Sequence, residues 1–253
     1  MVLDQFSLSG KVAIVTGCSA GLGQAMAYGL AEAGADIVGI DVVDFSETKE
    51  NIEGMGRRFL GINADISTPD PIEGIIRKAV ETFGKINILV NNAGAIRRAD
   101  AIDFTEKDWD DVMNINIKTV FFFSQAAARQ FIKQGTGGKI INIASMLSFQ
   151  GGIRVASYTA SKSGVMGITR HMANEWAKHN INANAIAPGW FATDITAALR
   201  ADPVRNKSIL DRIPAGRWGT PDDLKGVVVF LASDASNYVY GYTVAVDGGW
   251  LSM

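Results

Sequence analysis

The feature that most constrains the fold is a regular alternation of short apolar runs with longer amphipathic stretches. Apolar strands that alternate with helices are typical of a parallel sheet covered on both faces, with right-handed crossovers. We therefore expect an α/β, doubly wound fold. The expected strands are Val12–Thr16, Asp36–Asp41, Phe59–Ala64, Ile88–Asn91, Lys139–Ile143, Asn182–Ile186 and Thr243–Val246, and the expected helices are about Gly21–Ala33, Ser46–Met55, Pro69–Phe83, Trp109–Gln134, Ser157–His179 and Pro221–Ala232.

The size and composition favour one soluble domain over residues 1–253, because no repeat or linker divides the chain. A net charge of −2 gives no reason to expect nucleic acid or an anionic membrane as a partner. No apolar run reaches the ~18 residues of a membrane helix, and the first residues do not resemble a secretory signal. Cys18 is the only cysteine and no metal-binding motif is present, so we expect a cytoplasmic protein without a metal.

One long interval, between Gly189 and Gly219, has no clear strand. A long segment after a strand's carboxyl end in a compact domain is usually functional or mobile. We expect a substrate lid around residues 190–211; the alternative is a helical insertion that only covers the core.

A glycine-rich turn follows the first expected strand and opens the first helix. Glycines at this position let backbone N–H groups approach a pyrophosphate at the helix N-terminus. The spacing differs from the common G-x-G-x-x-G form, so the strand-turn-helix context carries the prediction. The candidate cofactor-binding residues of this turn are Gly17, Ser19, Gly21, Leu22 and Gly23.

The nature of the cofactor is indicated by Asp41, which closes the second expected strand. A carboxylate there can accept hydrogen bonds from ribose hydroxyls and repels a 2′-phosphate, which predicts NAD rather than NADP. A surface aspartate at a strand end is the alternative. Further candidates at strand ends are Asp65 and Ile66 near the adenine, and Asn92, Ala93 and Gly94, where small residues let the chain run close to adenosine.

An acid/base site is indicated by Tyr158 and Lys162, which share one face of an expected helix. Tyrosine has an ordinary pKa near ~10, and a nearby cation favours its phenolate form, so we expect Lys162 to lower the pKa of Tyr158. Ser145, at the end of a strand-like run, could hold a substrate oxygen beside the phenol.

The ordered set TGCSAGLG, NNAG, NINIKTVF, Ser145/Tyr158/Lys162 and APG resembles the short-chain dehydrogenase/reductase family. The resemblance implies one Rossmann-type domain with a seven-stranded parallel sheet. It also implies that Tyr158 is the acid/base and that Lys162 binds the nicotinamide ribose. Asn116 would hold a water in a proton relay, and Asn114 is a less favoured match for that role. Alternatively, Asn116 bridges backbone groups in a kinked helix. Pro188, Gly189 and Thr193 would contact the cofactor.

A narrower resemblance, from SLSGKVAIVTG to the last tryptophan, is to family members that act on sugar acids from pectin and uronate breakdown. A carboxylate substrate favours an arginine fork and side-chain amides. The candidate substrate residues are Arg154, Gln150, Trp190 and Arg97, with Arg154 preferred and Arg98 also near. The resemblance further implies a homo-oligomer, with a tetramer favoured. A 3-oxoacyl or other carbonyl reductase, and a non-catalytic NAD-binding scaffold, are the alternative functions.

Overall fold

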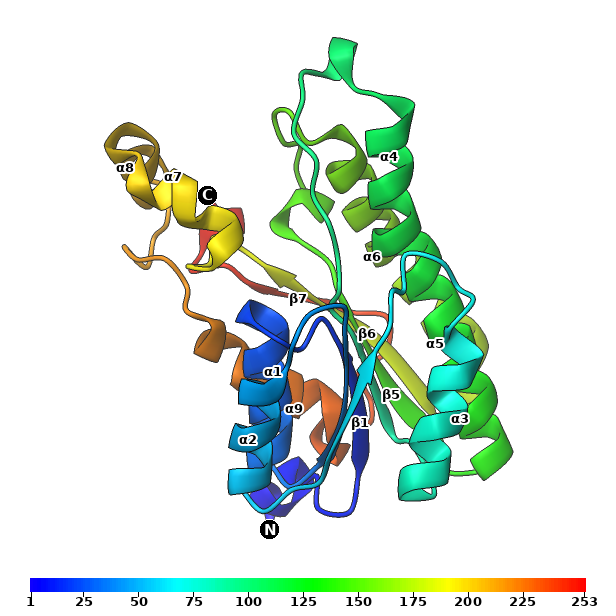
Figure 1. Cartoon of the computed structure of the whole chain (residues 1–253). Coiled ribbons are helices and arrows are strands. Elements are labelled where there is room, and N and C mark those ends of the chain that lie inside the picture. Colours follow the sequence, from blue (N-terminus) through cyan, green and yellow to red (C-terminus); the bar gives the residue numbers. More distant parts are fainter.

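The computed structural model describes residues 1–253 and contains a single parallel sheet of seven strands. The strands lie in the order β3-β2-β1-β4-β5-β6-β7, so the expected doubly wound sheet is confirmed (Figure 1). Their bounds are β1 (Val12–Thr16), β2 (Asp36–Asp41), β3 (Phe59–Asn63), β4 (Ile88–Asn91), β5 (Gly138–Ile143), β6 (Ile181–Pro188) and β7 (Thr243–Val246).

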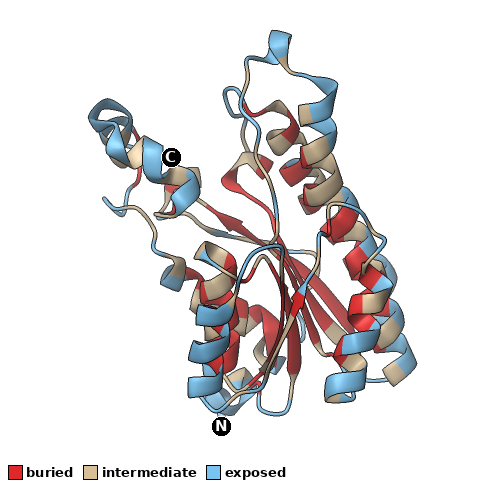
Figure 2. Cartoon of the chain, viewed as in Figure 1, coloured by how far each residue is buried: buried red, intermediate tan, exposed pale blue.

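Helices cover both faces of the sheet. One face carries α1 (Gly21–Glu32), α2 (Ser46–Gly54) and α9 (Lys225–Ala232), and the other carries α3 (Ile72–Phe83), α5 (Thr119–Gln134) and α6 (Ala156–Trp176) (Figure 1). The five inner strands, β2, β1, β4, β5 and β6, are almost wholly buried, whereas the edge strands β3 and β7 are mostly half-buried (Figure 2). This explains why their sequences read as continuous apolar runs.

Alternate residues of each strand enter different core clusters. Ile14 and Val38 pack with α3 and α5, whereas Val15 and Ile37 pack with α1 and α2. This follows from the two-residue period of a strand, in which successive side chains point to opposite faces. The two clusters are of similar size, so both faces of the sheet contribute to the core.

The helix expected over Trp109–Gln134 is instead three consecutive segments. It comprises α4 (Glu106–Met113), a π-helical turn over Asn114–Lys118, and α5. The helix begins earlier than expected because the Thr105 side chain accepts a hydrogen bond from the backbone N–H of Asp108 and so caps α4. The π-helical turn is a correction of the expected regular helix, and such turns are often found at functional sites.

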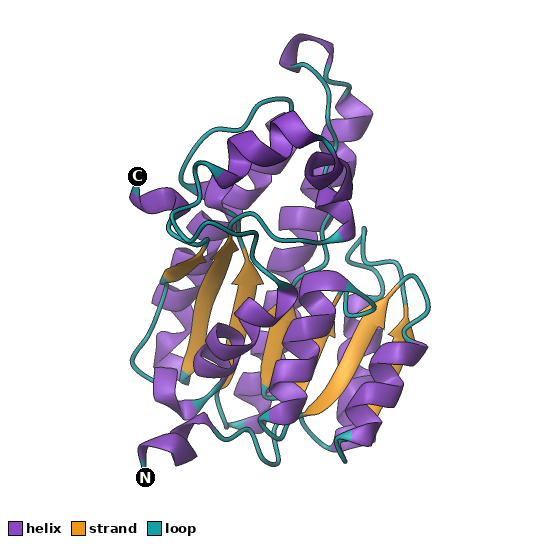
Figure 3. Cartoon of the chain, turned by 90° about the vertical axis from the view of Figure 1, so that its left-hand side faces the viewer, coloured by secondary structure: helices purple, strands orange, loops and turns teal.

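The carboxyl ends of the strands all lie at one edge of the sheet, where the chain order reverses between β1 and β4. Ligands bind at such a switch point in open α/β sheets. Two short helices, α7 (Ala197–Ala201) and α8 (Pro203–Leu210), lie in the expected segment at 190–211 (Figure 1). Figure 3 shows helices and loops gathered above the carboxyl ends of the strands. None of the helices combines the length and apolar character needed to cross a bilayer.

Candidate active site

The turn between β1 and α1 forms a close-packed cradle. Gly17 has a φ of +67°, and a Cβ there would lie 2.9 Å from the Asn92 side-chain nitrogen. A Cβ on Gly23 would lie 1.9 Å from the carbonyl oxygen of Gly17. Larger residues are therefore excluded at both positions, and the backbone stays open to a ligand as the sequence predicted.

Asn92 fixes this turn from the end of β4. Its Nδ2 donates to the carbonyl oxygens of Thr16 at 2.9 Å and of Gly17 at 3.0 Å. The amide is therefore used to hold the loop, so a contribution of Asn92 to cofactor binding acts through the position of Gly17. Thr193 approaches the same loop from the other side, with its methyl carbon 3.8 Å from a Cβ built on Gly21.

Asp41 is joined to the glycine-rich turn. Its Oδ2 accepts hydrogen bonds from the Ser19 backbone nitrogen at 3.0 Å and from the Ser19 hydroxyl at 2.6 Å. Its Oδ1 accepts one from the Val42 nitrogen at 2.8 Å. The carboxylate is thus held in place at the mouth of the adjoining cavity and keeps spare acceptor capacity.

That cavity has a volume of about 590 Å³ and runs along the carboxyl ends of the strands. It brings together several of the expected adenosine-binding residues from three separate strand ends. Asp65 is oriented by the Ser67 nitrogen, which donates to it at 2.8 Å and lowers the pKa of its carboxyl. The lining includes Gly17, Asp41, Asp65, Ile66, Ala93, Gly94 and Asn114.

Ser145, Tyr158 and Lys162 come together at the end of β5 and the start of α6. Lys162 Nζ lies 5.7 Å from the centre of the Tyr158 ring, so the two residues share a helix face as expected. Ser145 Oγ accepts a hydrogen bond from the Leu147 nitrogen at 3.1 Å, which orients the hydroxyl and leaves it able to donate. Lys162 Nζ donates to the carbonyl oxygen of Ile143 at 2.6 Å.

The expectation that Lys162 lowers the pKa of Tyr158 is wrong for this arrangement. Burial raises the pKa of Tyr158, and the groups that oppose the rise are the Ser145 hydrogen bond and the positive charge of Arg98. The Lys162 amine is turned to the Ile143 carbonyl, and burial lowers its own pKa to about 8. At neutral pH the phenol is therefore protonated, which is the form that a proton donor needs.

Asn116 lies fully buried in the π-helical turn. Its Oδ1 accepts from the Ala95 nitrogen at 2.8 Å, and its Nδ2 donates to the Ala95 carbonyl at 2.9 Å and to Ser161 Oγ at 3.1 Å. The backbone-bridging alternative is therefore what the structure contains, and it ties α6 to the segment after β4. Whether Asn116 also holds a relay water stays a prediction.

The arginines separate into paired and unpaired groups. Arg154, the preferred substrate residue, has its Nε 3.1 Å from Asp100 Oδ1, and Arg97 lies 3.6 Å from Asp108 and 3.4 Å from Asp111. Each of the two guanidinium groups is therefore paired with a carboxylate of the protein. Arg98 has no ion pair, and its charge acts on Tyr158. The ion pair of Arg154 with Asp100 could not be predicted from the sequence, because pairing with a distant carboxylate leaves no local signal, and the preference for Arg154 stays a prediction.

Of the remaining expected site residues, Trp190 lies at the start of the 190–211 segment. Trp190 packs edge-on against Trp218 and Trp250, with ring centres 5.7 and 5.8 Å apart. Gln150 is half-buried and forms no hydrogen bond within the protein. Pro188 ends β6 and Gly189 follows it, where a Cβ would lie 2.6 Å from Asp247. The segment 190–211 is therefore anchored by apolar contacts to the C-terminal residues.

Comparison with known proteins gives end-to-end matches. A family model described as enoyl-(acyl carrier protein) reductase matches residues 17–251. The 2-dehydro-3-deoxy-D-gluconate 5-dehydrogenase of Escherichia coli is 69% identical over 252 residues, which is 100% of both chains. The chain is a short-chain dehydrogenase/reductase. This short-chain dehydrogenase/reductase is an enzyme that acts on CH–OH groups.

Solved structures of other short-chain dehydrogenases/reductases share the architecture. A putative 2-deoxy-D-gluconate 3-dehydrogenase from Agrobacterium tumefaciens with bound NADP has a TM-score of 0.91 and 51% identity, covering 99% of this chain and 100% of that one. A gluconate 5-dehydrogenase from Burkholderia cenocepacia in complex with NADP and tartrate has a TM-score of 0.94 and 40% identity, covering 100% of both. The Gly17 and Gly23 cradle of this short-chain dehydrogenase/reductase fits a dinucleotide.

Proposed function

We propose that the enzyme interconverts a hydroxyl and a ketone on a sugar acid. The substrate is 2-dehydro-3-deoxy-D-gluconate at the 5-position or 2-deoxy-D-gluconate at the 3-position, in the breakdown of pectin-derived uronates. The observation that carries the proposal is the 69% identity over 100% of both chains to a 2-dehydro-3-deoxy-D-gluconate 5-dehydrogenase. Arg98, which forms no ion pair and whose positive charge opposes the rise in the pKa of Tyr158, is the proposed partner of the substrate carboxylate. An anionic substrate held by that arginine would present its carbon–oxygen bond to the phenol. The name of the 69% identical relative supports the same substrate.

The proposed catalytic residues act on the substrate oxygen in a fixed order. When bound, a nicotinamide dinucleotide supplies or accepts the hydride. In reduction, Tyr158 Oη donates a proton to the substrate oxygen while the Ser145 hydroxyl donates a hydrogen bond to it. The positive charge of Arg98 and the Ser145 hydroxyl favour the phenolate that remains. The Lys162 amine, held by the Ile143 carbonyl, is proposed to bind the nicotinamide ribose. Asn116 holds the backbone of Ala95 against α6 and so keeps the two sides of the site together.

We propose NAD rather than NADP as the preferred cofactor. Asp41 is fixed by two hydrogen bonds from Ser19, so its charge does not turn away from a neighbouring group. A 2′-phosphate placed beside that carboxylate meets like-charge repulsion. The bound NADP in two related structures makes the preference a matter for direct measurement. The proposed cofactor contacts otherwise remain those that the sequence indicated.

A 3-oxoacyl reductase is the second candidate, because the matching family model carries the name of an acyl-carrier-protein reductase. The charge of Arg98 near Tyr158 favours the sugar acid over an acyl thioester, which has no carboxylate at that end. A non-catalytic NAD-binding scaffold would have no need for a seryl hydroxyl, a phenol and a buried amine at one point of the sheet edge.

The substrate assignment can be tested by NADH absorbance with the purified enzyme. We expect turnover of 2-dehydro-3-deoxy-D-gluconate or 2-deoxy-D-gluconate, and little with an acetoacetyl thioester. Arg98→Ala should raise KM for the sugar acid at least ~10-fold, because a charged hydrogen bond contributes ~1.5–3 kcal/mol, with a smaller loss of kcat. Arg154→Ala is the matched control and should change KM less. Thioester turnover with an unchanged KM in Arg98→Ala would contradict the proposal.

We further propose a homotetramer in the cytoplasm. Support for self-association comes from partly exposed large apolar side chains along α4 and α5, namely Trp109, Phe122 and Ile132, and from exposed tyrosines beside β7, Tyr238 and Tyr242. Support for a reducing compartment is the buried free thiol of Cys18. Light scattering coupled to gel filtration measures the assembly, and a monomer at micromolar concentration would contradict it.

A further inference from the structure

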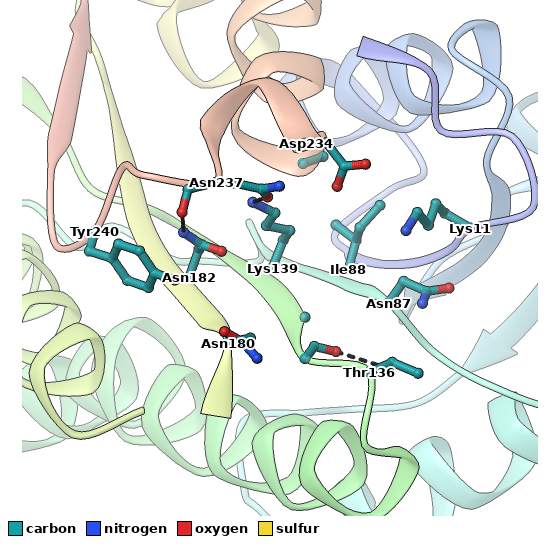
Figure 4. A pocket seen from close by; sticks show the side chains of 13 residues that line it. Lys11, Asn87, Ile88, Thr136, Lys139, Asn180, Asn182, Asp234, Asn237 and Tyr240 are labelled. Atoms are coloured by element: carbon teal, nitrogen blue, oxygen red, sulfur yellow. Dashed lines mark hydrogen bonds between the residues drawn. The ribbon is translucent and has the colours of Figure 1, made fainter. Parts of the chain in front are cut away.

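A second, polar cavity lies at the opposite edge of the sheet from the acid/base site (Figure 4). It has a volume of about 340 Å³ and is lined by residues at the starts of β4, β5 and β6. Lys139 at the start of β5 lines it, whereas Ile143 at the end of that strand holds Lys162. Four residues of strand separate them by ~13 Å, so the two sites are distinct.

The cavity contains a buried amine without a matching carboxylate. Lys139 is 8% exposed, and its Nζ donates to Asn237 Oδ1 at 2.7 Å and to Ser236 Oγ at 3.4 Å. It forms no ion pair, and burial lowers its pKa to about 8, with Asp234 opposing this fall and Lys11 adding to it. A buried charge whose hydrogen-bond partners are all neutral is costly, and an anion would offset that cost.

The remaining lining supplies further donors. Lys11 takes part in no ion pair or side-chain hydrogen bond, and its amine reaches toward the same space as Lys139 (Figure 4). Asn87 uses its oxygen to accept from the Val12 nitrogen at 3.0 Å, which leaves its NH₂ group to donate. Asp234 is the only carboxylate of the lining, against two lysines. The cavity therefore has a net positive charge and several unused donors.

We propose that this cavity binds a small oxyanion, a phosphate or a carboxylate, between Lys11 and Lys139. Both lysines act as point charges, and the amide of Asn87 adds a directed hydrogen bond. The cavity is large enough for a compact metabolite that carries such a group. The inference does not depend on the substrate proposed for the catalytic site.

The test is titration calorimetry of the NADH-saturated enzyme with inorganic phosphate, and separately with acetate, at constant ionic strength. Saturation with NADH keeps phosphate out of the glycine-rich cradle. We expect saturable binding and a rise in melting temperature of ~3–6 °C at ten times Kd. If only phosphate binds, the natural ligand of the cavity carries a phosphate group. If both anions bind, ligands that carry a carboxylate also fit the cavity.

Variants separate a binding site from a merely structural lysine. Lys11→Gln and Lys139→Met should weaken anion binding at least ~10-fold, whereas Asp234→Asn should tighten it ~5-fold by removing a repulsive charge. Lys78→Gln, on the exposed face of α3, should leave binding unchanged. If Lys139→Met fails to fold, the anion affinities of Lys11→Gln and Asp234→Asn still test the proposal. The proposal is overturned if neither anion binds saturably, or if Lys11→Gln and Asp234→Asn both bind like the wild type.

Discussion

Asp41→Asn is the sharpest test of the proposed cofactor preference, because it removes a charge while preserving most of the local hydrogen bonds. The asparagine Oδ1 can still accept from the Ser19 nitrogen and hydroxyl, which now lie 3.0 and 2.6 Å from Asp41 Oδ2. Only the acceptor for the Val42 nitrogen, 2.8 Å away, is replaced by a donor. The glycine-rich turn should therefore keep its shape.

The size of the effect follows from the position of the carboxylate. Asp41 is half-exposed at the mouth of the cavity, so a water-like dielectric gives a lower bound. Two unit charges at ~4 Å then repel by ~1 kcal/mol, and a 2′-phosphate carries about two charges, which gives ~2 kcal/mol or about 30-fold. Loss of charge assistance to the ribose hydroxyls of NAD should cost ~1 kcal/mol, about 5-fold.

The assay is kcat/KM for NAD and for NADP with one sugar-acid substrate, in wild type and variant. The ratio should move toward NADP by ~10²-fold, mostly through KM. Asp65→Asn is the matched control, since Asp65 lines the same cavity from β3 but is expected near the adenine. Equal use of both cofactors by the wild type, or the same ratio in Asp41→Asn, would refute the reasoning.

Three further outcomes are expected. Gly23→Ala should abolish tight NADH binding, measured by fluorescence titration, because its Cβ would lie 1.9 Å from a carbonyl oxygen; Gly167→Ala in α6, with nothing within 4 Å, should bind NADH normally. Tyr158→Phe should lower kcat by ~10² or more with NADH affinity retained, and undiminished turnover would remove the phenol from the mechanism. The pKa of Lys162 is 10.5 in the unfolded chain but about 8 in the folded protein. Because the unfolded state binds more protons between these two values, the contribution of Lys162 to the free energy of unfolding rises with pH there. Lys162→Met should therefore unfold at higher denaturant than wild type at pH 7, with the advantage shrinking by pH 10; a constant difference would contradict this.

The sheet could be predicted well from the sequence because a strand buried on both faces appears as a short run of apolar residues. The bounds of Val12–Thr16, Asp36–Asp41, Ile88–Asn91 and Thr243–Val246 agree with the structure to the residue. Each is a short apolar run that ends at, or next to, a polar or turn-forming residue. The helix over Trp109–Gln134 was less predictable, because its π-helical turn depends on contacts made by Asn116 to a distant loop.

The candidate site was predictable in its residues but less so in its electrostatics. Helical spacing is enough to place Tyr158 and Lys162 on one face, and the structure confirms it. The direction of the Tyr158 pKa depends on burial, which no local pattern reports, and on Arg98. The same holds for Arg154, whose partner Asp100 could be found only once both loops had been folded together.

The indole contacts of Trp190 have a practical consequence for anyone who purifies this enzyme. Trp250 sits three residues from the C-terminus, and it contacts the 190–211 segment through Trp190. An affinity tag fused after Met253 would lie beside this indole contact, whereas the N-terminus lies at the far end of the molecule (Figure 1). An affinity tag should therefore be placed before Met1. If a C-terminally tagged preparation turns over slowly, the tag should be removed before the slow rate is attributed to the catalytic residues.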